Sequence, residues 1–470
     1  MLLPSHSFSR RTLLATLLGA SALPLLAACS GSPSSSPSPT TAPAAAAAGA
    51  AATSKPASTP ATGAAATPAA VAGGSPATLS MIGLSGHPSW LATKEMVKAY
   101  KDKAPQVDFK LSEFDLPQIN DKVNLDFQAK KGEYDIVWMN SAQTVGYWSE
   151  AGVVAPLDEL ITPAYDLADF LKLAHDIGTV KGKLWGIAIM IEQRMLSYRK
   201  DLLDQASIAV PTTVDEMVVA AEKLTHKDKN QFGFTQRNAA GGAAGFDWMG
   251  WLYAYGGKVY DDNYKTLLTS AEAKAALDNY LKAEQFTSPA KNRSYGEIAK
   301  ELQTGVAAMG NDVTIITPIL EDPQASQFAG KFGYAVAPAG PKGPRPETSA
   351  HLLAISALSK QRDAAWAFIQ WMTSKENNKP WVFAGGAAFR ESMYQDKDII
   401  AKYPQYTLFK QILDQGNPDY VPRIKVSNEI LTKIGDGINA AAAGAKSADQ
   451  ALADTDKAVA DILKREGYQK

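Results

Sequence analysis

Short apolar runs alternate with stretches of helical spacing from residue 77 onward, and this alternation limits the chain to few folds. Thr78–Gly83, Val107–Leu111 and Tyr134–Met139 have the length and composition of strands, the last of them a buried one. Between them, Ser89–Ala104 and Ile119–Lys130 space their apolar residues as helices do. Strands that alternate with helices predict an α/β body with parallel sheets.

The same pattern continues to the end of the chain. Gly182–Ala188 predicts a turn that enters a further strand. Amphipathic spacing predicts further helices, and no internal repeat is present. These helices are expected at 214–224, 271–282, 294–301, 361–372 and 447–466.

The segment 30–78 differs sharply from this body. It consists almost wholly of Ser, Pro, Thr, Ala and Gly, so it has too little apolar surface to form a core. A coil of this length spans on the order of 40 Å. We therefore expect 29–78 to be a linker that leaves the body free to reorient.

The first 28 residues have the pattern of an export signal. The pair Arg10 and Arg11 precedes the apolar stretch Leu13–Leu26, which is the arrangement of a twin-arginine signal peptide. The stretch is too short to span a membrane as a mature helix. Leu26–Cys29 resembles the bacterial lipobox, whose cysteine is lipidated after cleavage. The sequence thus predicts a signal peptide at 1–28 and a protein held by lipid at the outer face of the cell membrane; the alternative is a cleaved leader with a chance cysteine.

Composition excludes several classes of function. Cys29 is the only cysteine, so the body is predicted to have no disulfide, cysteine–metal site or thiol nucleophile. The formal net charge is -1, and no basic patch suggests a nucleic-acid partner. No Walker-A loop is present, and we expect no cofactor.

Four groups of segments carry a resemblance to a known family through their order and spacing. Together they resemble the extracellular solute-binding proteins of sugar ABC importers, the family that includes maltose-binding protein. The segments are Gly132–Trp138 with Gly152–Asp158, Gly182–Ala188 with Tyr198–Leu203, Gly305–Asn311 with Gly333–Pro338, and Leu353–Ile355 with Ala364–Ile369 and Gly385–Arg390.

The resemblance implies a two-lobed α/β fold of the periplasmic-binding-protein type II, with hinge strands that cross between the lobes and a ligand enclosed in the cleft. One lobe would comprise 79–189 and 339–385, and the other 190–338 and 386–470. The protein would be a monomer and not an enzyme. It would deliver a small carbohydrate or polyol to the transmembrane subunits of an ABC permease.

A neutral polyhydroxy ligand requires aromatic rings and fixed hydrogen-bonding groups. In the first lobe we expect these from His87 and Trp90 after the first strand, and from Trp138 and Asn140 at the carboxyl end of a strand. His351 lies beside the strand at 352–355. The alternatives are a helix cap for His87 and a core position for Trp138.

Glu192 occupies the family position of a ligand-binding glutamate just before the lobe crossing, and a carboxylate can accept from two adjacent hydroxyls. Arg194 is expected to pair with it; the alternative is a hinge ion pair without ligand. A small-residue loop, Ala239–Gly245, is predicted to present Phe246, Asp247 and Trp248 at the start of a helix, with Trp248 as the stacking ring.

The remaining candidates come from the second lobe and the second crossing. They are Asn311, Asp312, Arg390 and Asn428. Asn311 could equally cap a helix, and Arg390 could have a structural role. The family's large aromatic after Asp312 is absent here, which favours a small ligand.

Two alternatives stay open from the sequence. An exported glycoside-processing enzyme would need two facing carboxylates, and only Asp247 and Glu192 suggest such a pair. The second alternative is a metal- or anion-binding receptor of the same fold. Iron capture would favour a tyrosine cluster with histidine and carboxylates, but Tyr253, Tyr255, Tyr260 and Tyr264 lie on an apparent helix and turn, where a packing role is expected.

Overall fold

The computed structural model describes residues 76–469. The predicted signal peptide at 1–28, Cys29 and most of the predicted linker lie outside these residues. The strands are β1 (Ala77–Leu84), β2 (Val107–Phe114), β3 (Ile136–Asn140), β4 (Thr179–Val180), β5 (Lys183–Leu184), β6 (Ile187–Arg199), β7 (Met309–Val313), β8 (Phe332–Val336) and β9 (Thr348–Ile355).

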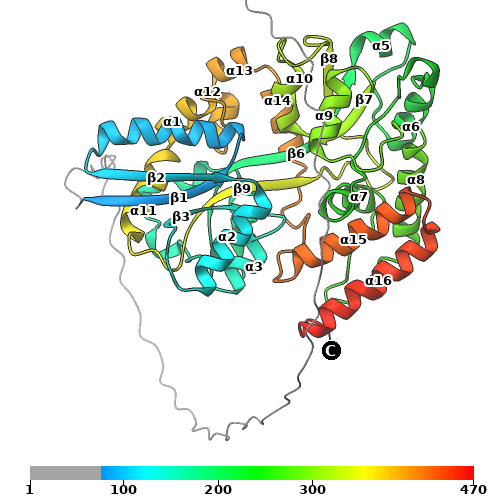
Figure 1. Cartoon of the computed structure of the whole chain (residues 1–470). Helices are drawn as coiled ribbons and strands as arrows, with labels where there is room; N and C mark the ends of the chain where they lie inside the picture. Colours follow the sequence, from blue (N-terminus) through cyan, green and yellow to red (C-terminus); the bar gives the residue numbers. More distant parts are fainter. Residues whose placement is uncertain (1–75, 470) are drawn as a thin grey trace, which may run out of the picture. The chain divides into compact units, whose positions relative to one another are not determined.

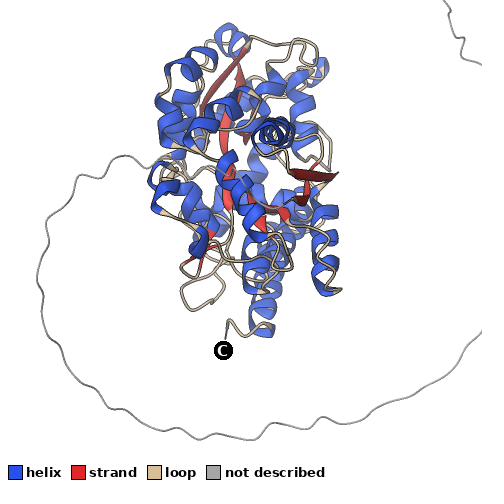
Figure 2. Ribbon diagram, turned by 90° about the vertical axis from the view of Figure 1, so that its left-hand side faces the viewer, coloured by secondary structure: helices blue, strands red, loops and turns tan. Residues whose placement is uncertain are grey.

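The α-helices flank the strands (Figure 2). They are α1 (Pro88–Lys103), α2 (Leu116–Gln128), α3 (Val145–Glu150), α4 (Lys172–Gly178), α5 (Lys200–Gln205), α6 (Val214–Lys223), α7 (Gly242–Ala254), α8 (Ala271–Glu284), α9 (Tyr295–Gln303), α10 (Thr317–Leu320), α11 (Arg362–Met372), α12 (Lys375–Phe383), α13 (Lys397–Lys402), α14 (Tyr406–Leu413), α15 (Ser427–Ala442) and α16 (Ala448–Arg465).

The first three long strands form a parallel core, as the sequence predicts. β1 pairs in parallel with β2 and β3, and α1 and α2 lie on opposite sides of these strands (Figure 1). β9 then pairs antiparallel with β3, so the sheet is mixed rather than purely parallel. The predicted strands at 78–83, 107–111 and 134–139 overlap β1, β2 and β3, with ends that differ by up to three residues.

β6 links two groups of strands. Its first half pairs with β9, and its second half, from Arg194 on, pairs with β7 and β8. The pairing of β6 with β9 shifts register between Ala188 and Met190. Every residue of β6 is buried except Glu192 and Tyr198. A strand buried on both faces gains stability from both groups it joins.

Two large buried clusters lie on either side of this link. The first surrounds β1, β3 and β9, and the second surrounds α7, α8, α15 and α16. Ala388, Phe389, Met393 and Ile399 belong to the first cluster, although they follow residue 385. The bounds of the two lobes stay a prediction. Because these four residues pack in the first cluster, the packing favours a start of the last second-lobe segment later in the chain than residue 386.

The stretch before Phe246 is partly helical, whereas the sequence predicts a loop as far as Gly245. Helix α7 already begins at Gly242, after Gly241 with a φ of 75°. α7 packs closely on α15, side by side with it in Figure 1. A Cβ at Gly245 would lie 2.3 Å from the carbonyl oxygen of Leu431, and one at Gly435 would lie 1.6 Å from that of Gly241. The glycines therefore permit close helix packing.

We expect Gly435→Ala to lower the free energy of unfolding by about 3 kcal/mol, because the added methyl group forces α7 and α15 apart. Gly296→Ala is the matched control: Gly296 is also helical, and a Cβ there meets no atom within 4 Å. It should raise stability by about 0.5–1 kcal/mol. Urea unfolding of both variants measures the difference, and equal effects would contradict the packing argument.

Candidate ligand-binding site

A cavity of about 830 Å³ lies where β1, β3, β6 and β9 meet elements of the second cluster. One wall comes from the loop after β1 and the end of β3, and the opposite wall comes from α7 and α9. The polar and aromatic side chains that line it are Ser85, His87, Asp115, Asn140, Gln143, Glu192, Arg237, Phe246, Ser294, Tyr295, Glu347, Ser349 and His351.

Three ionisable side chains meet on the first wall of the cavity. A nitrogen of His87, a nitrogen of His351 and a carboxylate oxygen of Glu192 all lie within 4.8 Å of one another. His351 Nε2 is 3.7 Å from Glu192 Oε2, and the same oxygen accepts a hydrogen bond of 3.1 Å from Ser349 Oγ. His87 and His351 also lie ring against ring, with centroids 5.4 Å apart.

Burial and neighbouring charge move the pKa values of this group apart. Burial, together with His351, lowers the pKa of His87 to about 4, although Glu192 opposes the shift. Burial raises the pKa of Glu192, but the attraction of His351, His87 and Arg237 outweighs it and brings the value to about 2. Near pH 7 the cavity therefore holds a neutral His87 beside a carboxylate.

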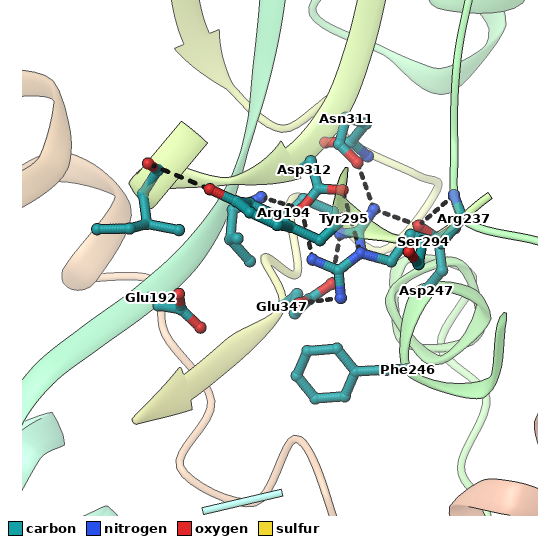
Figure 3. Close-up of polar contacts among 12 residues, drawn as sticks. Glu192, Arg194, Arg237, Phe246, Asp247, Ser294, Tyr295, Asn311, Asp312 and Glu347 are labelled. Carbon is teal, nitrogen blue, oxygen red and sulfur yellow. Dashed lines mark hydrogen bonds and ion pairs between the residues drawn. The ribbon is translucent and has the colours of Figure 1, made fainter. Parts of the chain in front are cut away.

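A buried ionic cluster lies beside the first group (Figure 3). Arg194 on β6 donates to Asp247 Oδ1 at 2.6 Å and to Glu347 Oε2 at 2.8 Å. Arg237 donates to Asp312 Oδ1 at 2.5 Å. All but Arg237 are less than 5% exposed. Arg194 therefore pairs with Asp247 and Glu347, and the prediction that it pairs with Glu192 is wrong.

Three carboxylates share two guanidinium groups in this cluster. Burial raises the pKa of Glu347 to about 7, although Arg194 and Arg237 lower it, and the charge of Asp312 adds to the increase. Burial also raises the pKa of Asp247, against the opposing effect of the two arginines. The cluster is neutral when one carboxylate is protonated, and a pKa of about 7 allows Glu347 to hold that proton near neutral pH.

The second wall of the cavity is aromatic. Phe246, on the first turns of α7, lines the cavity and is 8% exposed. Its ring packs edge-on against Tyr420, with centroids 5.1 Å apart, and Arg237 lies 6.0 Å from its centre. Tyr295 at the start of α9 lies on the same side.

Five of the predicted ligand-binding residues line this cavity: His87, Asn140, Glu192, Phe246 and His351. A second set lies behind the lining and contacts it. Trp138 donates to His351, while Arg194, Asp247, Asn311 and Asp312 form or adjoin the ionic cluster. Whether each contacts ligand stays a prediction.

The other four predicted residues lie elsewhere. Trp90 and Trp248 are fully buried in the first and second clusters, so the ring that α7 presents to the cavity is that of Phe246 and not of Trp248. Arg390 is buried and donates to the carbonyl oxygens of Thr373, Asp166 and Tyr165, which is the structural role left open above. Asn428 lines a separate cavity of about 440 Å³.

Five further residues of the lining were not predicted from the sequence: Arg237, Ser294, Tyr295, Glu347 and Ser349. Glu347 lies just before β9 and Ser349 lies within it, close in sequence to the predicted His351. Their position near a crossing strand could therefore have indicated that they belong to the site. Arg237 lies in an irregular segment with no motif. Nothing in its sequence context indicates that it meets Asp312, 75 positions later.

Asp247 and Glu192 do not form the facing carboxylate pair of a glycoside-processing enzyme. Asp247 is fully buried, accepts from Arg194 and does not line the cavity. It therefore does not face Glu192 across a ligand, as an acid and its partner carboxylate must.

The comparisons with known proteins agree with this geometry. Residues 88–379 match the family model of bacterial extracellular solute-binding proteins, and the chain belongs to this family. The mannitol-binding protein of Pseudomonas aeruginosa is 27% identical over 402 residues, which cover 80% of this chain and 91% of that protein.

Two solved structures of ABC transporter solute-binding proteins are similar throughout the body. That from Agrobacterium radiobacter, in complex with ribitol, has a TM-score of 0.76 at 29% identity and covers 83% of this chain and 99% of its own. That from Agrobacterium vitis, with bound D-mannitol, has a TM-score of 0.73 at 27% identity and covers 84% and 100%. These likenesses confirm the predicted two-lobed α/β fold and the family.

The matched family, the relative and both structures are binding proteins.

Within residues 76–469, no helix has the length and apolar character needed to cross a membrane.

The raised pKa of Glu347 predicts a pH dependence of stability. Because its folded pKa of about 7 exceeds the ordinary value of 4.5, its contribution to stability is fully present below about pH 4.5 and is lost as pH rises through 7. The loss amounts to about 3 kcal/mol at most. The side chain in Glu347→Gln is uncharged at every pH. We therefore expect the free energy of unfolding of this variant to depend less on pH between 5 and 8 than that of the wild type.

Glu113→Gln is the control for this experiment. Its hydrogen bonds to Lys94 and Trp90 lower the pKa of Glu113, so its contribution to stability changes only below about pH 4.5. Denaturant unfolding at several pH values measures the slopes. Parallel curves for Glu347→Gln and the wild type would contradict the assignment.

Proposed function

We propose that this protein is the receptor of an ABC importer and captures a polyol or a small sugar in the cavity between its two lobes. The observation that carries the proposal is the composition of the cavity. Glu192, His87, His351 and Asn140 offer an acceptor and several donors on one wall, and Phe246 offers an apolar face on the other. Relatives that bind mannitol and ribitol support it.

The cavity suits an acyclic polyol better than a stacked oligosaccharide. Val313, Ile315 and Ile319 stand on the second wall, where large aromatic rings would be needed to cover further sugar faces. Phe246 and Tyr295 are the aromatic side chains other than histidine among the lining residues. An acyclic chain of a few carbons presents hydroxyls to one wall and C–H groups to the other.

The proposal includes the way in which the receptor is held and used. Cys29 would carry the lipid after twin-arginine export, and the segment 30–78 would tether the body. Closure of the lobes about β6 and β9 would enclose the ligand and create the surface that a permease recognises. The protein would act as a monomer and catalyse no reaction.

A second candidate function rests on one specific observation. His87, His351 and Glu192 are near enough together to hold a metal ion, so the receptor could capture a divalent cation instead. The same experiment distinguishes the two functions.

We expect a thermal-unfolding screen to show stabilisation by polyols such as D-mannitol and ribitol. Ligand at a thousand times Kd adds about 4 kcal/mol to the free energy of unfolding when it binds only the folded state. Glu192→Gln should abolish most of the response. No shift with any polyol or sugar, together with a shift from Zn²⁺, an anion or an amino acid, would overturn the proposed function.

The position of Phe246 predicts a further result. Phe246→Leu keeps an apolar side chain but removes the flat ring, so binding of the polyol found in the screen should weaken about three- to tenfold. Trp248→Phe is the matched control. It should lower stability by about 1–2 kcal/mol through a core cavity and leave affinity unchanged. Calorimetric titration decides, and weaker binding in Trp248→Phe alone would place the stacking ring at 248.

A further inference from the structure

In each of the two cavity histidines, His87 and His351, the Nδ1 atom faces an N–H donor from the protein interior. Trp138 Nε1 lies 2.6 Å from His351 Nδ1, and the backbone nitrogen of Ser89 lies 3.1 Å from His87 Nδ1. An indole N–H and a backbone N–H can only donate. Each Nδ1 must therefore offer a lone pair, and these partners assign the proton of each imidazole to Nε2.

One contact of His351 favours the other tautomer. Asn140 Nδ2 lies 3.4 Å from His351 Nε2, and Asn140 Oδ1 is already the acceptor for the backbone N–H groups of Ala142 and Gln143. The amide thus directs a donor at Nε2. The bond from Trp138 prevails because it is 0.8 Å shorter and lies in the apolar core, where a hydrogen bond is strongest.

The Nε2 atoms of His87 and His351 and the carboxylate of Glu192 leave a gap between them. His87 Nε2 is buried without a hydrogen-bond partner, and the 3.7 Å from His351 Nε2 to Glu192 Oε2 is too long for a direct bond. A hydroxyl oxygen accepts two hydrogen bonds and donates one. Partners that each lie about 2.8 Å from one oxygen can be at most about 5.6 Å apart, and this group, with one separation of 3.7 Å and none above 4.8 Å, meets that condition.

We propose that His87, His351 and Glu192 form a cradle for one alcohol hydroxyl, and that Trp138 is the positioning residue that fixes His351 as a donor. The hydroxyl accepts from both Nε2–H groups and donates to Glu192. The identity of the ligand as a polyol rests on the proposed function, whereas the tautomers do not.

The same bonds oppose a metal ion in the cradle. A histidine that binds a metal through Nε2 normally donates its Nδ1–H to an acceptor. Here both Nδ1 atoms accept instead. A cation at Nε2 would require the imidazole to lose its proton entirely, or the bonds from Trp138 and Ser89 to break. The cradle therefore selects a hydroxyl over a divalent cation.

The tautomers can be read without any ligand. Long-range ¹H–¹⁵N spectra of the labelled protein at pH 8 should show His87 and His351, assigned with His87→Gln and His351→Gln, as Nε2–H forms. Trp138→Phe should mix the tautomers of His351 and leave His87 unchanged. Trp148→Phe is the control, since Trp148 is an equally buried tryptophan that donates to Asn124. A proton on Nδ1 of His351 in the wild type, or no change in Trp138→Phe, overturns the proposal.

Binding provides a second readout. D-mannitol, the probe here, should bind Trp138→Phe about two- to tenfold more weakly than the wild type, the range expected for one lost hydrogen bond, and Trp148→Phe should bind as the wild type does. Zn²⁺ should bind no better to the wild type than to His351→Gln. Stoichiometric Zn²⁺ that D-mannitol displaces would overturn the cradle. If no polyol binds but both histidines show Nε2–H, the proposed function fails while the tautomer assignment stands.

Discussion

The guanidinium of Arg194 holds together the segments that meet at the crossing between the two buried clusters. It lies on β6, donates to Glu347 just before β9, to Asp247 on α7 and to the carbonyl oxygen of Asn311 on β7. Loss of a buried partner leaves uncompensated charge, which costs several kcal/mol. Both crossing strands and the helix that bears Phe246 therefore depend on one side chain. The aromatic wall keeps its position relative to Glu192 because Arg194 is only two residues away on the same strand.

Strand geometry explains why ligand chemistry and structural charge adjoin each other. Residues two apart on a strand share a face, so Glu192 and Arg194 project from the same side of β6. At Glu192 that side opens into the cavity, and at Arg194 it is covered by α7. The carboxylate is thus free for a ligand while the guanidinium is fully used within the protein. A reversed order would place a carboxylate in the core and leave the arginine in the cavity.

Much of the fold could be predicted from the sequence, but only part of the site. The alternation of strands and helices and the order of the family segments indicate the α/β architecture, and Glu192 follows from its place before the crossing. Trp248 was misplaced because α7 is apolar on nearly all sides, so its sequence does not show that Phe246 faces the cavity and Trp248 the core. Arg237 and Glu347 owe their roles to partners 75 and 153 positions away in the chain. Hydrophobic periodicity carries no information about such pairs.

The balance of charge around the cavity argues for a neutral ligand. Arg237 lines the cavity, yet its charge is already neutralised by Asp312, so it offers little attraction to an anion. Glu192, which also lines it, repels anionic groups, and a phosphate or carboxylate on the ligand would be desolvated without a free cation to pair with. A cation is disfavoured in turn, because His87 and His351 present N–H groups beside the one available carboxylate. A hydroxyl, which both donates and accepts, satisfies this mixture of groups without burying a charge.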